Sequence, residues 1–372
     1  MKILIISHAY AERANHKKLE LLSKKEDLKV GVVYPSCWKT WHGEEKRSQN
    51  SEQRTQNSYA EFPLDPLFSG NWGRYVYNPI QLIISILNFR PDIVHLEEEP
   101  FTPVAFQVAL LSIILRFRLT FFTWENIVDL NLSWRRKVIE VFVFRTAVGG
   151  LAGTNGAKER LVKRGFDRQI EVIPQFGVDS DLFYPSIRPR LANVVVVGFV
   201  GRPTLDKGID VLFRALSKLP EKYQLLWVTS SPSIPPVISD QIRSLGLEYR
   251  VRIETNIPHE KLSEYYHQMD IFVLPSRTTY TWKEQFGRTL VEAMASGVPV
   301  VGSSSGAIPE VVGEAGLIFK EEDATVLANI LDSLADPKER DRLREKGLRR
   351  VFESYSLERI VESLYKFFKD QI

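Results

Sequence analysis

Short apolar runs that alternate with helix-like segments constrain the fold of this chain more than any other feature. Runs of this length between helical segments are typical of a parallel sheet that is buried on both faces. In the first half of the chain the runs are Ile3–Ile6, 29–34, 92–96 and 119–123. A second series comprises 193–200, 224–228, 251–254, 271–274 and 298–301.

Two such series in 372 residues predict two doubly wound domains rather than one. Turn-forming residues are dense from Pro174 to Pro189, so we expect an N-terminal domain over 1–187 and a C-terminal domain over 188–355. Residues 356–372 have helical spacing and are expected to pack back on the first domain. The predicted fold class is α/β, with two Rossmann-like domains facing across a cleft that holds the site.

The composition excludes several classes of protein. A formal net charge of +3 gives no reason to expect a nucleic acid partner, and the single cysteine, Cys37, rules out an internal disulfide. The six histidines are scattered, so no metal site is predicted. Met1 leads directly into the first apolar run, which favours a strand over a signal peptide, and the apolar stretches are shorter than the roughly 20 residues of a membrane span. We therefore expect a cytoplasmic protein.

A polar stretch and a glycine turn are the first candidate functional segments. Residues 43–60 lack periodicity and are expected to form a loop that touches substrate. Gly201 follows the run 193–200 and lets the backbone approach a bulky anion, while Arg202 and Lys207 add two positive charges. A tight turn with two solvated cations is the alternative interpretation.

The stretch from Glu284 to Val301 carries a stronger signal. Residues 288–296 predict a helix that begins at Gly287, and a helix start offers unpaired N–H groups and a positive dipole end to a diphosphate. Glu284 precedes this helix and Glu292 lies inside it, roughly 12 Å away by helical rise. That spacing suits one carboxylate on a sugar and the other on a ribose, and is too long for an acid/base pair. The alternative is two solvated surface carboxylates.

In combination, these motifs resemble the retaining glycosyltransferases of family four, also called glycosyl transferases group 1, which have the GT-B fold. Gly201-Arg202 with Lys207-Gly208 resembles the family's G-R-x-x-x-x-K-G stretch, and Glu284 through Glu292 its E-x7-E motif. Residues 306–310 resemble its G-x-P-E turn, and 177–185 its hinge. The resemblance is most specific over 198–310.

The resemblance implies a reaction and its participants. A sugar would move from a nucleotide-diphosphate-sugar donor to a hydroxyl of a glycan, a lipid-linked sugar or a small molecule, with retention of configuration. No metal or other cofactor is implied, and the β-phosphate of the leaving nucleotide would take the acceptor proton. Glu284, Arg202 and Lys207 would be catalytic. The implied donor-binding residues are Gly201, Phe286, Gly287, Arg288, Thr289, Leu290, Glu292 and Ile257.

The first domain departs from the family pattern. The stretch from Ser7 to His16 has no glycine, although the family carries a glycine-rich loop there. His8 is predicted to contact the acceptor, with a structural histidine as the alternative. Glu125 stands where the family has a histidine, and we predict that it hydrogen-bonds sugar hydroxyls or acts as a base. Capping of the following helix is the alternative.

Three consecutive acids, Glu97, Glu98 and Glu99, follow another strand of the first domain. Recognition of a hydroxyl-rich acceptor is one interpretation, with Glu97 and Glu98 as the contributors. A solvated rim or a helix cap is the other, because adjacent carboxylates repel one another.

Residues 134–145 mix basic and apolar side chains at helical spacing. Such a helix can contact the inner face of the cell membrane, in which case the acceptor would be lipid-linked. It can equally be an ordinary helix with its apolar stripe in the core.

Two other functions remain open on the same scaffold. One is a nucleotide-sugar epimerase, and the other is a homologue that binds a nucleotide sugar or a glycan with little or no turnover. A sugar phosphorylase would need a pyridoxal-phosphate lysine site, for which there is no signature. A dehydrogenase is not predicted, because no G-x-G-x-x-G follows either first strand.

Overall fold

The computed structural model describes residues 1–39, 45–47, 58–68, 73–186 and 193–372. Most of the expected 43–60 loop, and the expected domain boundary between 187 and 188, lie outside the described residues. The chain divides into two compact units. Unit 1 comprises Met1–Phe176 and Ile360–Ile372, and unit 2 comprises Gly177–Arg359. The division falls eleven residues before the domain boundary expected from the sequence (187 − 176).

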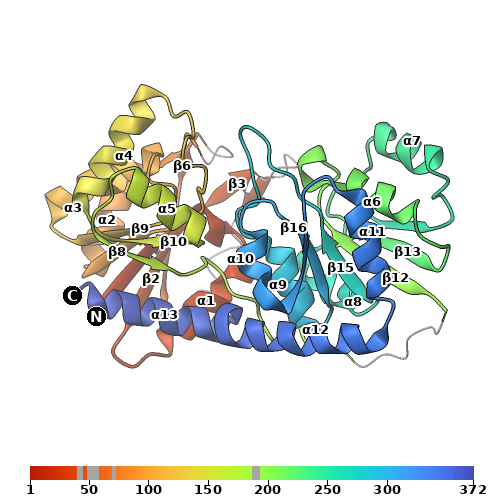
Figure 1. The fold of residues 1–372 in the computed structure, drawn as a ribbon. Coiled ribbons are helices and arrows are strands. Elements are labelled where there is room, and N and C mark those ends of the chain that lie inside the picture. The colour runs from red at the N-terminus through yellow and green to blue at the C-terminus, as the bar shows by residue number, and fades with distance from the viewer. Residues whose placement is uncertain (40–44, 48–57, 69–72, 187–192) are drawn as a thin grey trace. The chain divides into compact units, whose positions relative to one another are not determined.

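Unit 1 is built on a seven-stranded parallel sheet (Figure 1). Its order is β11-β10-β9-β8-β1-β2-β5. The strands are β1 (Lys2–Ile6), β2 (Lys29–Pro35), β5 (Ala60–Leu64), β8 (Ile93–Leu96), β9 (Arg118–Thr123), β10 (Ala147–Ala152) and β11 (Gln169–Val172). Two short antiparallel pairs accompany the sheet: β3 (Cys37–Lys39) with β4 (Glu45–Arg47), and β6 (Pro66–Leu67) with β7 (Val76–Tyr77).

Helices cover both faces of this sheet, because alternate residues of each buried strand point to opposite sides. Leu4 and Ile6 belong to the core on one face, together with residues of α2, α3, α4 and α5. Ile3 and Ile5 belong to the core on the other face, with residues of α1 and α13. The helices are α1 (Lys17–Ser23), α2 (Pro79–Phe89), α3 (Pro103–Leu115), α4 (Trp134–Thr146), α5 (Asn155–Lys163) and α13 (Leu357–Asp370).

The starts of α2 and α3 follow from their sequences. Asn78 and Thr102 are the N-caps, and each side chain accepts a hydrogen bond from a backbone N–H of the first turn. Proline at the first helical position fits both helices, because that N–H has no intrahelical partner. The two helices end at Arg90 and Arg116, which both adopt the left-handed conformation.

Unit 2 contains a six-stranded parallel sheet of order β14-β13-β12-β15-β16-β17. Its strands are β12 (Val195–Val200), β13 (Tyr223–Val228), β14 (Val251–Glu254), β15 (Ile271–Leu274), β16 (Val300–Ser303) and β17 (Gly316–Phe319). Its helices are α6 (Ile209–Leu216), α7 (Pro236–Ser244), α8 (Leu262–Tyr266), α9 (Arg288–Ala295), α10 (Ile308–Val312), α11 (Ala324–Ser333) and α12 (Pro337–Arg350). Two parallel sheets with helical connections confirm the predicted α/β class.

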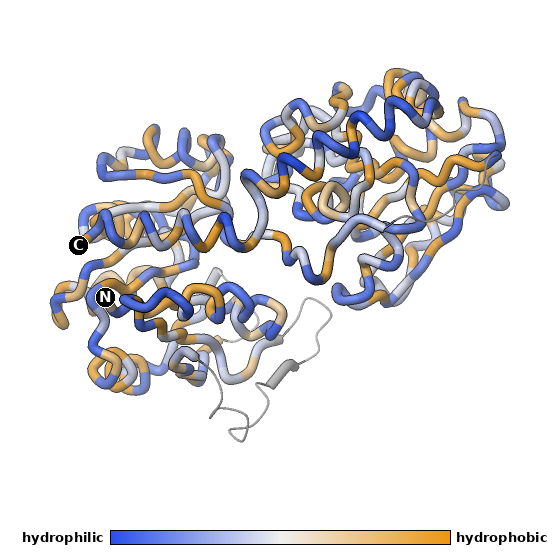
Figure 2. The backbone as a smooth tube through the Cα atoms, turned by 90° about the horizontal axis from the view of Figure 1, so that it is seen from below, coloured by the Kyte–Doolittle hydropathy of each residue, from blue (hydrophilic) through white to orange (hydrophobic). Residues whose placement is uncertain are grey.

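The last helix joins the core of unit 1. Helix α13 alternates hydrophilic and hydrophobic residues along its length (Figure 2). Its apolar face, which includes Leu364, Phe367 and Phe368, packs in the same core as Ile3 and Val32. Across the described residues, no helix combines the length and the apolar character that a bilayer crossing requires.

We predict that unit 1 depends on this helix for stability. Phe368 is fully buried, so Phe368→Ala should leave a cavity and lower the free energy of unfolding by about 3–5 kcal/mol. Urea unfolding measures the change. Lys366→Ala, an exposed position on the same helix, should change stability by no more than about 0.5 kcal/mol. Equal effects of the two substitutions would contradict a structural role of the buried face.

Candidate functional site

The loop after β12 is held tightly against the end of β15. It begins with Gly201 and Arg202 and ends in a single 3₁₀ turn, Leu205–Lys207. Gly208 follows with φ +67°, and a Cβ at this position would lie 1.9 Å from the carbonyl oxygen of Pro275. Only glycine fits such a close backbone approach. The turn therefore presents Lys207 at the carboxyl edge of the unit 2 sheet, where ligands of parallel sheets bind.

Lys207 and Glu284 meet at this edge. The Nζ atom of Lys207 lies 2.7 Å from Oε2 of Glu284, and the hydroxyl of Ser276 donates to the same oxygen at 2.8 Å. The ammonium also lies 4.6 Å from the centre of the Trp282 ring, a cation–π contact. We call these four residues the Lys207 cluster. Two of them, Lys207 and Glu284, were predicted site residues, and the structure brings them into direct contact.

The backbone of Glu284 is fixed by the turn at Gly306. The N–H of Ala307 donates to the Glu284 carbonyl at 2.9 Å. Gly306 has φ +53°, and a Cβ there would lie 2.0 Å from the same carbonyl oxygen. The loop 201–208, the segment that begins at Glu284 and the turn at Gly306 come from separate parts of the sequence and meet at the Lys207 cluster. Arg202 lies exposed at the start of the Gly201 loop.

Helix α9 begins after Gly287, which has φ +79°, as predicted, and spans Arg288–Ala295, one residue less than the predicted 288–296. Glu292 is buried on this helix and accepts from Nε2 of His259 at 2.8 Å and from the Tyr266 hydroxyl at 3.0 Å. Nε of Arg288 lies 3.0 Å from its Oε1. Burial alone would raise the pKa of Glu292, but these donors outweigh it and hold the pKa below its usual value. Glu292 is therefore an anchored carboxylate rather than a solvated one.

The other predicted donor-binding residues differ in how much they expose. Leu290 is fully buried, and Phe286 is buried against the ring of Tyr355. Ile257 is half-buried after β14, where its N–H donates to the Thr229 carbonyl. Thr289 is half-buried, and its carbonyl oxygen accepts from the Tyr266 hydroxyl at 3.4 Å. The side chains of Phe286 and Leu290 are thus packed inside unit 2 at the start of α9 and do not point to solvent.

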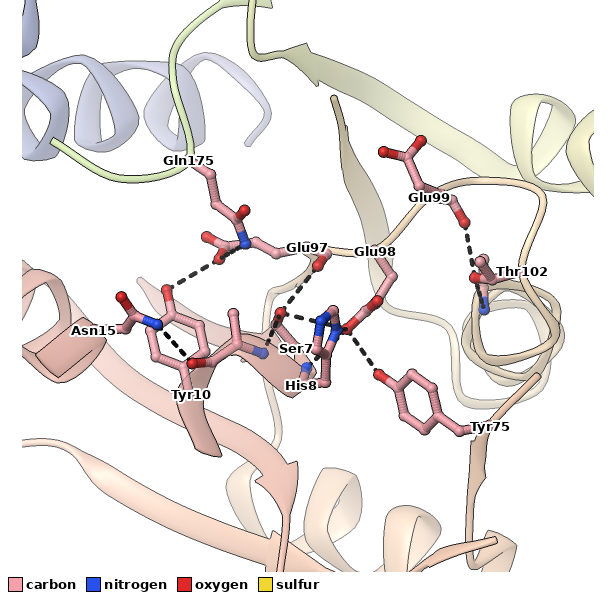
Figure 3. Close-up of polar contacts among 12 residues, drawn as sticks. Ser7, His8, Tyr10, Asn15, Tyr75, Glu97, Glu98, Glu99, Thr102 and Gln175 are labelled. Atoms are coloured by element: carbon pink, nitrogen blue, oxygen red, sulfur yellow. Dashed lines mark hydrogen bonds and ion pairs between the residues drawn. The ribbon is translucent and has the colours of Figure 1, made fainter. Parts of the chain in front are cut away.

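In unit 1, four donors converge on one oxygen of Glu98 (Figure 3). Nδ1 of His8 lies 2.6 Å from Oε1 of Glu98, and the backbone N–H of His8 donates to it at 2.7 Å. The hydroxyls of Tyr75 and Ser7 donate to the same oxygen at 2.7 and 3.3 Å. We call these four residues the Glu98 cluster. The structure brings the predicted residues His8 and Glu98 together and adds Tyr75, which sequence reasoning missed.

The geometry assigns the protonation of His8. An ionised carboxylate only accepts hydrogen bonds, so Nδ1 carries the proton and Nε2 of the neutral ring is an acceptor. The His8 side chain is 32% exposed, against 2% for Glu98. Burial lowers the pKa of His8, but the charge of Glu98 and its hydrogen bond outweigh burial and raise the pKa above its usual value.

Glu97, which was predicted to contact an acceptor, is bonded within unit 1 instead. Its carboxylate is buried and lies 2.5 Å from Nζ of Lys18, itself fully buried. Its other oxygen accepts from the Tyr10 hydroxyl and from the side chain of Gln175, both at 3.1 Å. Burial opposes the charge of Glu97, but Lys18 outweighs it and keeps its pKa below the usual value. Both oxygens are thus bonded inside unit 1, and Glu97 has a structural role.

Glu99 and Glu125 lie together at the end of β9. Glu99 accepts from the Thr123 hydroxyl at 2.5 Å and from the backbone N–H of Trp124 at 2.8 Å. Burial and the neighbouring charge of Glu125 raise the pKa of Glu99 to about 7. Glu125 accepts from the N–H of Ile127 at 2.8 Å and is half-buried. Sequence reasoning rated Glu99 below its two neighbours, because only the fold shows that the three side chains point in different directions (Figure 3).

Comparison with known families decides what unit 2 is. Residues 188–350 match the family "Glycosyl transferases group 1". The chain carries a group 1 glycosyltransferase domain. This match confirms the family resemblance of the motifs in residues 198–310.

Individual relatives support the same assignment. A D-inositol 3-phosphate glycosyltransferase of Corynebacterium kroppenstedtii is 30% identical over 228 residues, which are 55% of this chain and 49% of that protein. The chain thus spans about half the length of the curated relatives it matches.

Solved structures extend the likeness to the first half of the chain. Sucrose-phosphate synthase of Thermosynechococcus elongatus has a TM-score of 0.74 at 20% identity, covering 100% of this chain and 98% of that one. HepE of Anabaena, solved in complex with UDP-glucose, has a TM-score of 0.73 at 18% identity, covering 100% of both chains. At these identities the likeness establishes the fold alone. It confirms the predicted GT-B fold for the group 1 glycosyltransferase domain and the unit that precedes it.

We predict that Glu99 makes stability depend on pH. Its pKa is raised from 4.5 to about 7, so the folded protein holds this proton more tightly than the unfolded chain. The free energy of unfolding should therefore fall as the pH rises through that interval. Glu99→Gln should flatten this dependence in urea unfolding at a series of pH values. Glu26→Gln, which removes an exposed carboxylate of unit 1, should leave it unchanged, and an unchanged slope in Glu99→Gln would refute the assignment.

Proposed function

We propose that the protein is a retaining glycosyltransferase that moves a sugar from a nucleotide-diphosphate-sugar donor to a hydroxyl acceptor without a metal ion or other cofactor. The observation that carries this proposal is the contact of Lys207 with Glu284, 2.7 Å apart at the carboxyl edge of the sheet and beside the start of α9. The match of this unit to the group 1 glycosyltransferases supports it. So does the UDP-glucose bound by HepE, a protein of the same fold.

Unit 2 supplies the charges that a diphosphate requires. Lys207 offers a compact ammonium, Arg202 offers a planar set of donors, and the first turn of α9 offers backbone N–H groups at its positive end. Lys207 is paired with Glu284. A bound diphosphate would draw the ammonium toward itself and free Glu284 for the hydroxyls of the donor sugar. The same positive charge takes over the neutralising role that a metal has in other transferases.

Glu292 is suited to the ribose of the donor. It is buried and ionised, and it is held by His259 and Tyr266 from neighbouring segments. A carboxylate has about four acceptor positions, so two ribose hydroxyls can donate to it alongside these bonds. Arg288, whose side chain is 47% exposed, is the partner of Glu292 that can most easily move aside.

The proposed reaction balances without an added base. The acceptor hydroxyl oxygen forms a bond to the anomeric carbon as the bond from that carbon to the β-phosphate oxygen breaks. The nucleoside diphosphate leaves with the electron pair, and the hydroxyl proton passes to an oxygen of the leaving β-phosphate. Lys207, Arg202 and the start of α9 stabilise the charge that develops on that phosphate.

Unit 1 supplies the acceptor contacts in this proposal. Nε2 of His8 accepts a hydrogen bond from an acceptor hydroxyl, and Glu98 holds the ring in the required tautomer. The ring centre of Trp38 lies 5.0 Å from that of His8 and is tilted by 30°, which provides an aromatic surface beside the same nitrogen. Glu125 and Glu99 are further acceptors of hydroxyl hydrogen bonds. The acceptor is a sugar or a lipid-linked sugar, and the expected location is cytoplasmic, at the inner face of the membrane.

The donor site is tested by ligand-induced thermal stabilisation. We predict that at least one of the UDP-, GDP- and ADP-sugars raises the melting temperature. Lys207→Ala and Glu284→Ala should abolish that shift, and Lys207→Ala should lower kcat/KM by at least about 100-fold, because it removes charge from the leaving group. Lys338→Ala, on the exposed surface of α12, is the matched control and should retain the shift.

The same assay separates the alternative functions. An unchanged shift in both variants would refute the site. Product formed from the donor alone would identify an epimerase, and a shift that depends on Lys207 and Glu284 without any turnover would identify a binding protein.

The role of His8 is tested by the pH profile of transfer. Only neutral His8 can accept the hydroxyl hydrogen bond, so kcat/KM for the acceptor should fall as the pH drops through the pKa of His8. Glu98→Gln removes the charge that raises this pKa, so the acid limb should move to lower pH. His8→Ala should raise the acceptor KM and remove this limb while donor-induced stabilisation persists.

Nuclear magnetic resonance of His8 gives a readout that is independent of activity. Its titration should shift to lower pH in Glu98→Gln. His267→Ala, which removes a half-buried histidine of unit 2, should leave the acid limb in place. An acid limb at the same pH in wild type and Glu98→Gln would contradict the acceptor role.

A further inference from the structure

Three helices of unit 1 share an unusual outer surface. Helices α2, α3 and α4 cover the same face of the sheet, because their inward residues pack into one core with Leu4 and Ile6. Helix α3 also packs directly on α4. Figure 1 shows all three at the same end of unit 1.

Each of these helices has a second apolar stripe that faces solvent. On α2, Ile80, Ile84 and Leu87 are exposed, and on α4, Trp134, Val138 and Val141 are exposed. Both sets follow the spacing i, i+4, i+7, which places their members on one side of a helix. Helix α3 repeats the pattern with Phe106, Leu110, Ile113 and Ile114. We call this three-helix surface the apolar face.

The apolar face is not explained by the core that the same helices build. Trp134 is 71% exposed and Ile80 is 68% exposed, so most of the surface of these two residues stays in contact with water. Single exposed apolar residues are common, but apolar stripes repeated on three helices of one sheet face mark a surface that binds something. On α4, Val143 and Phe144 enter the core, as the interpretation of 134–145 as an ordinary helix requires, while Trp134 and Val138 face outward.

The charges of this surface indicate that its partner is negatively charged. All residues of the three helices are described, and they include one carboxylate, Glu140, which is buried and paired with Arg160 and Arg164. Arg135, Lys137 and Arg145 of α4 are exposed, and the C-caps of α2 and α3 are the exposed Arg90 and Arg116. Cations without exposed acids, beside apolar side chains, are complementary to an anionic lipid surface.

We propose that the apolar face of α2, α3 and α4 binds the surface of an anionic lipid bilayer. The aliphatic side chains enter the boundary between headgroups and acyl chains, and the arginine and lysine side chains contact lipid phosphates. Trp134 is placed for the headgroup level, where indole rings concentrate, and the guanidinium carbon of Arg135 lies 5.4 Å from its ring centre. The binding is peripheral and does not depend on the proposed transfer reaction.

Vesicle co-sedimentation of the full chain tests this inference. The protein should sediment with vesicles of phosphatidylcholine mixed with phosphatidylglycerol, far less with phosphatidylcholine alone, and less as salt is added. The double variant Arg135→Glu and Lys137→Glu should weaken binding by at least about tenfold. The double variant Ile113→Glu and Ile114→Glu should weaken it to a similar extent, because it places charge on the buried side of the contact.

Helix α7 of unit 2, which is not part of the apolar face, provides a matched control for each kind of substitution. Val237 is exposed there, and Arg243 forms an exposed ion pair with Asp240. Val237→Glu and Arg243→Glu should leave vesicle binding unchanged, and circular dichroism checks that every variant is folded.

Three outcomes would overturn the proposal. One is a lack of binding to the anionic vesicles, and another is an equal loss in the α7 controls. The third is concentration-dependent self-association that Ile113→Glu and Ile114→Glu abolish while vesicles are not bound, which would assign the face to contacts between copies of this chain. None of these outcomes bears on the donor site, because none of the measurements uses a nucleotide sugar.

Discussion

A parallel sheet that is covered by helices on both faces leaves the ends of its strands as the place for polar chemistry. The interiors of β1, β12 and β15 are occupied by apolar side chains, so a charged group there would lose its hydration without compensation. Polar groups of both clusters and their neighbours instead lie just beyond strand ends: Ser7 and His8 after β1, Glu97 to Glu99 after β8, and Ser276 two residues after β15. Both polar clusters depend on this constraint.

The buried acids show how strongly local partners decide the role of a carboxylate. Glu97, Glu98 and Glu99 are consecutive, yet the first pairs with buried Lys18, the second orients His8, and the third accepts from Thr123. Lys18 keeps the pKa of Glu97 below its usual value, whereas burial and the nearby charge of Glu125 raise the pKa of Glu99 to about 7. In unit 2, Glu284 and Glu292 are likewise separated into different networks, one with Lys207 and one with His259.

Helix α4 shows how one segment can serve two surfaces. Its Val143 and Phe144 help to close the core over the sheet, and its buried Glu140 binds two arginines. Its Trp134, Val138 and Val141 lie outside that core and stay exposed beside cations. The same division recurs on α2 and α3, and this recurrence on three helices gives the surface its extent.

The sequence by itself determined the two series of parallel strands, the group 1 glycosyltransferase motifs and the start of α9, because these follow from local periodicity and from turns that only glycine can form. It also singled out Lys207 and Glu284, which the structure brings into direct contact. Only the tertiary structure decided the rest. Lys18 is 79 residues from Glu97 and Tyr75 is 23 residues from Glu98, and no local pattern shows which side chain will meet which carboxylate. Whether an acid binds a ligand or stabilises the core depends on such long-range partners, since they set both its burial and its charge.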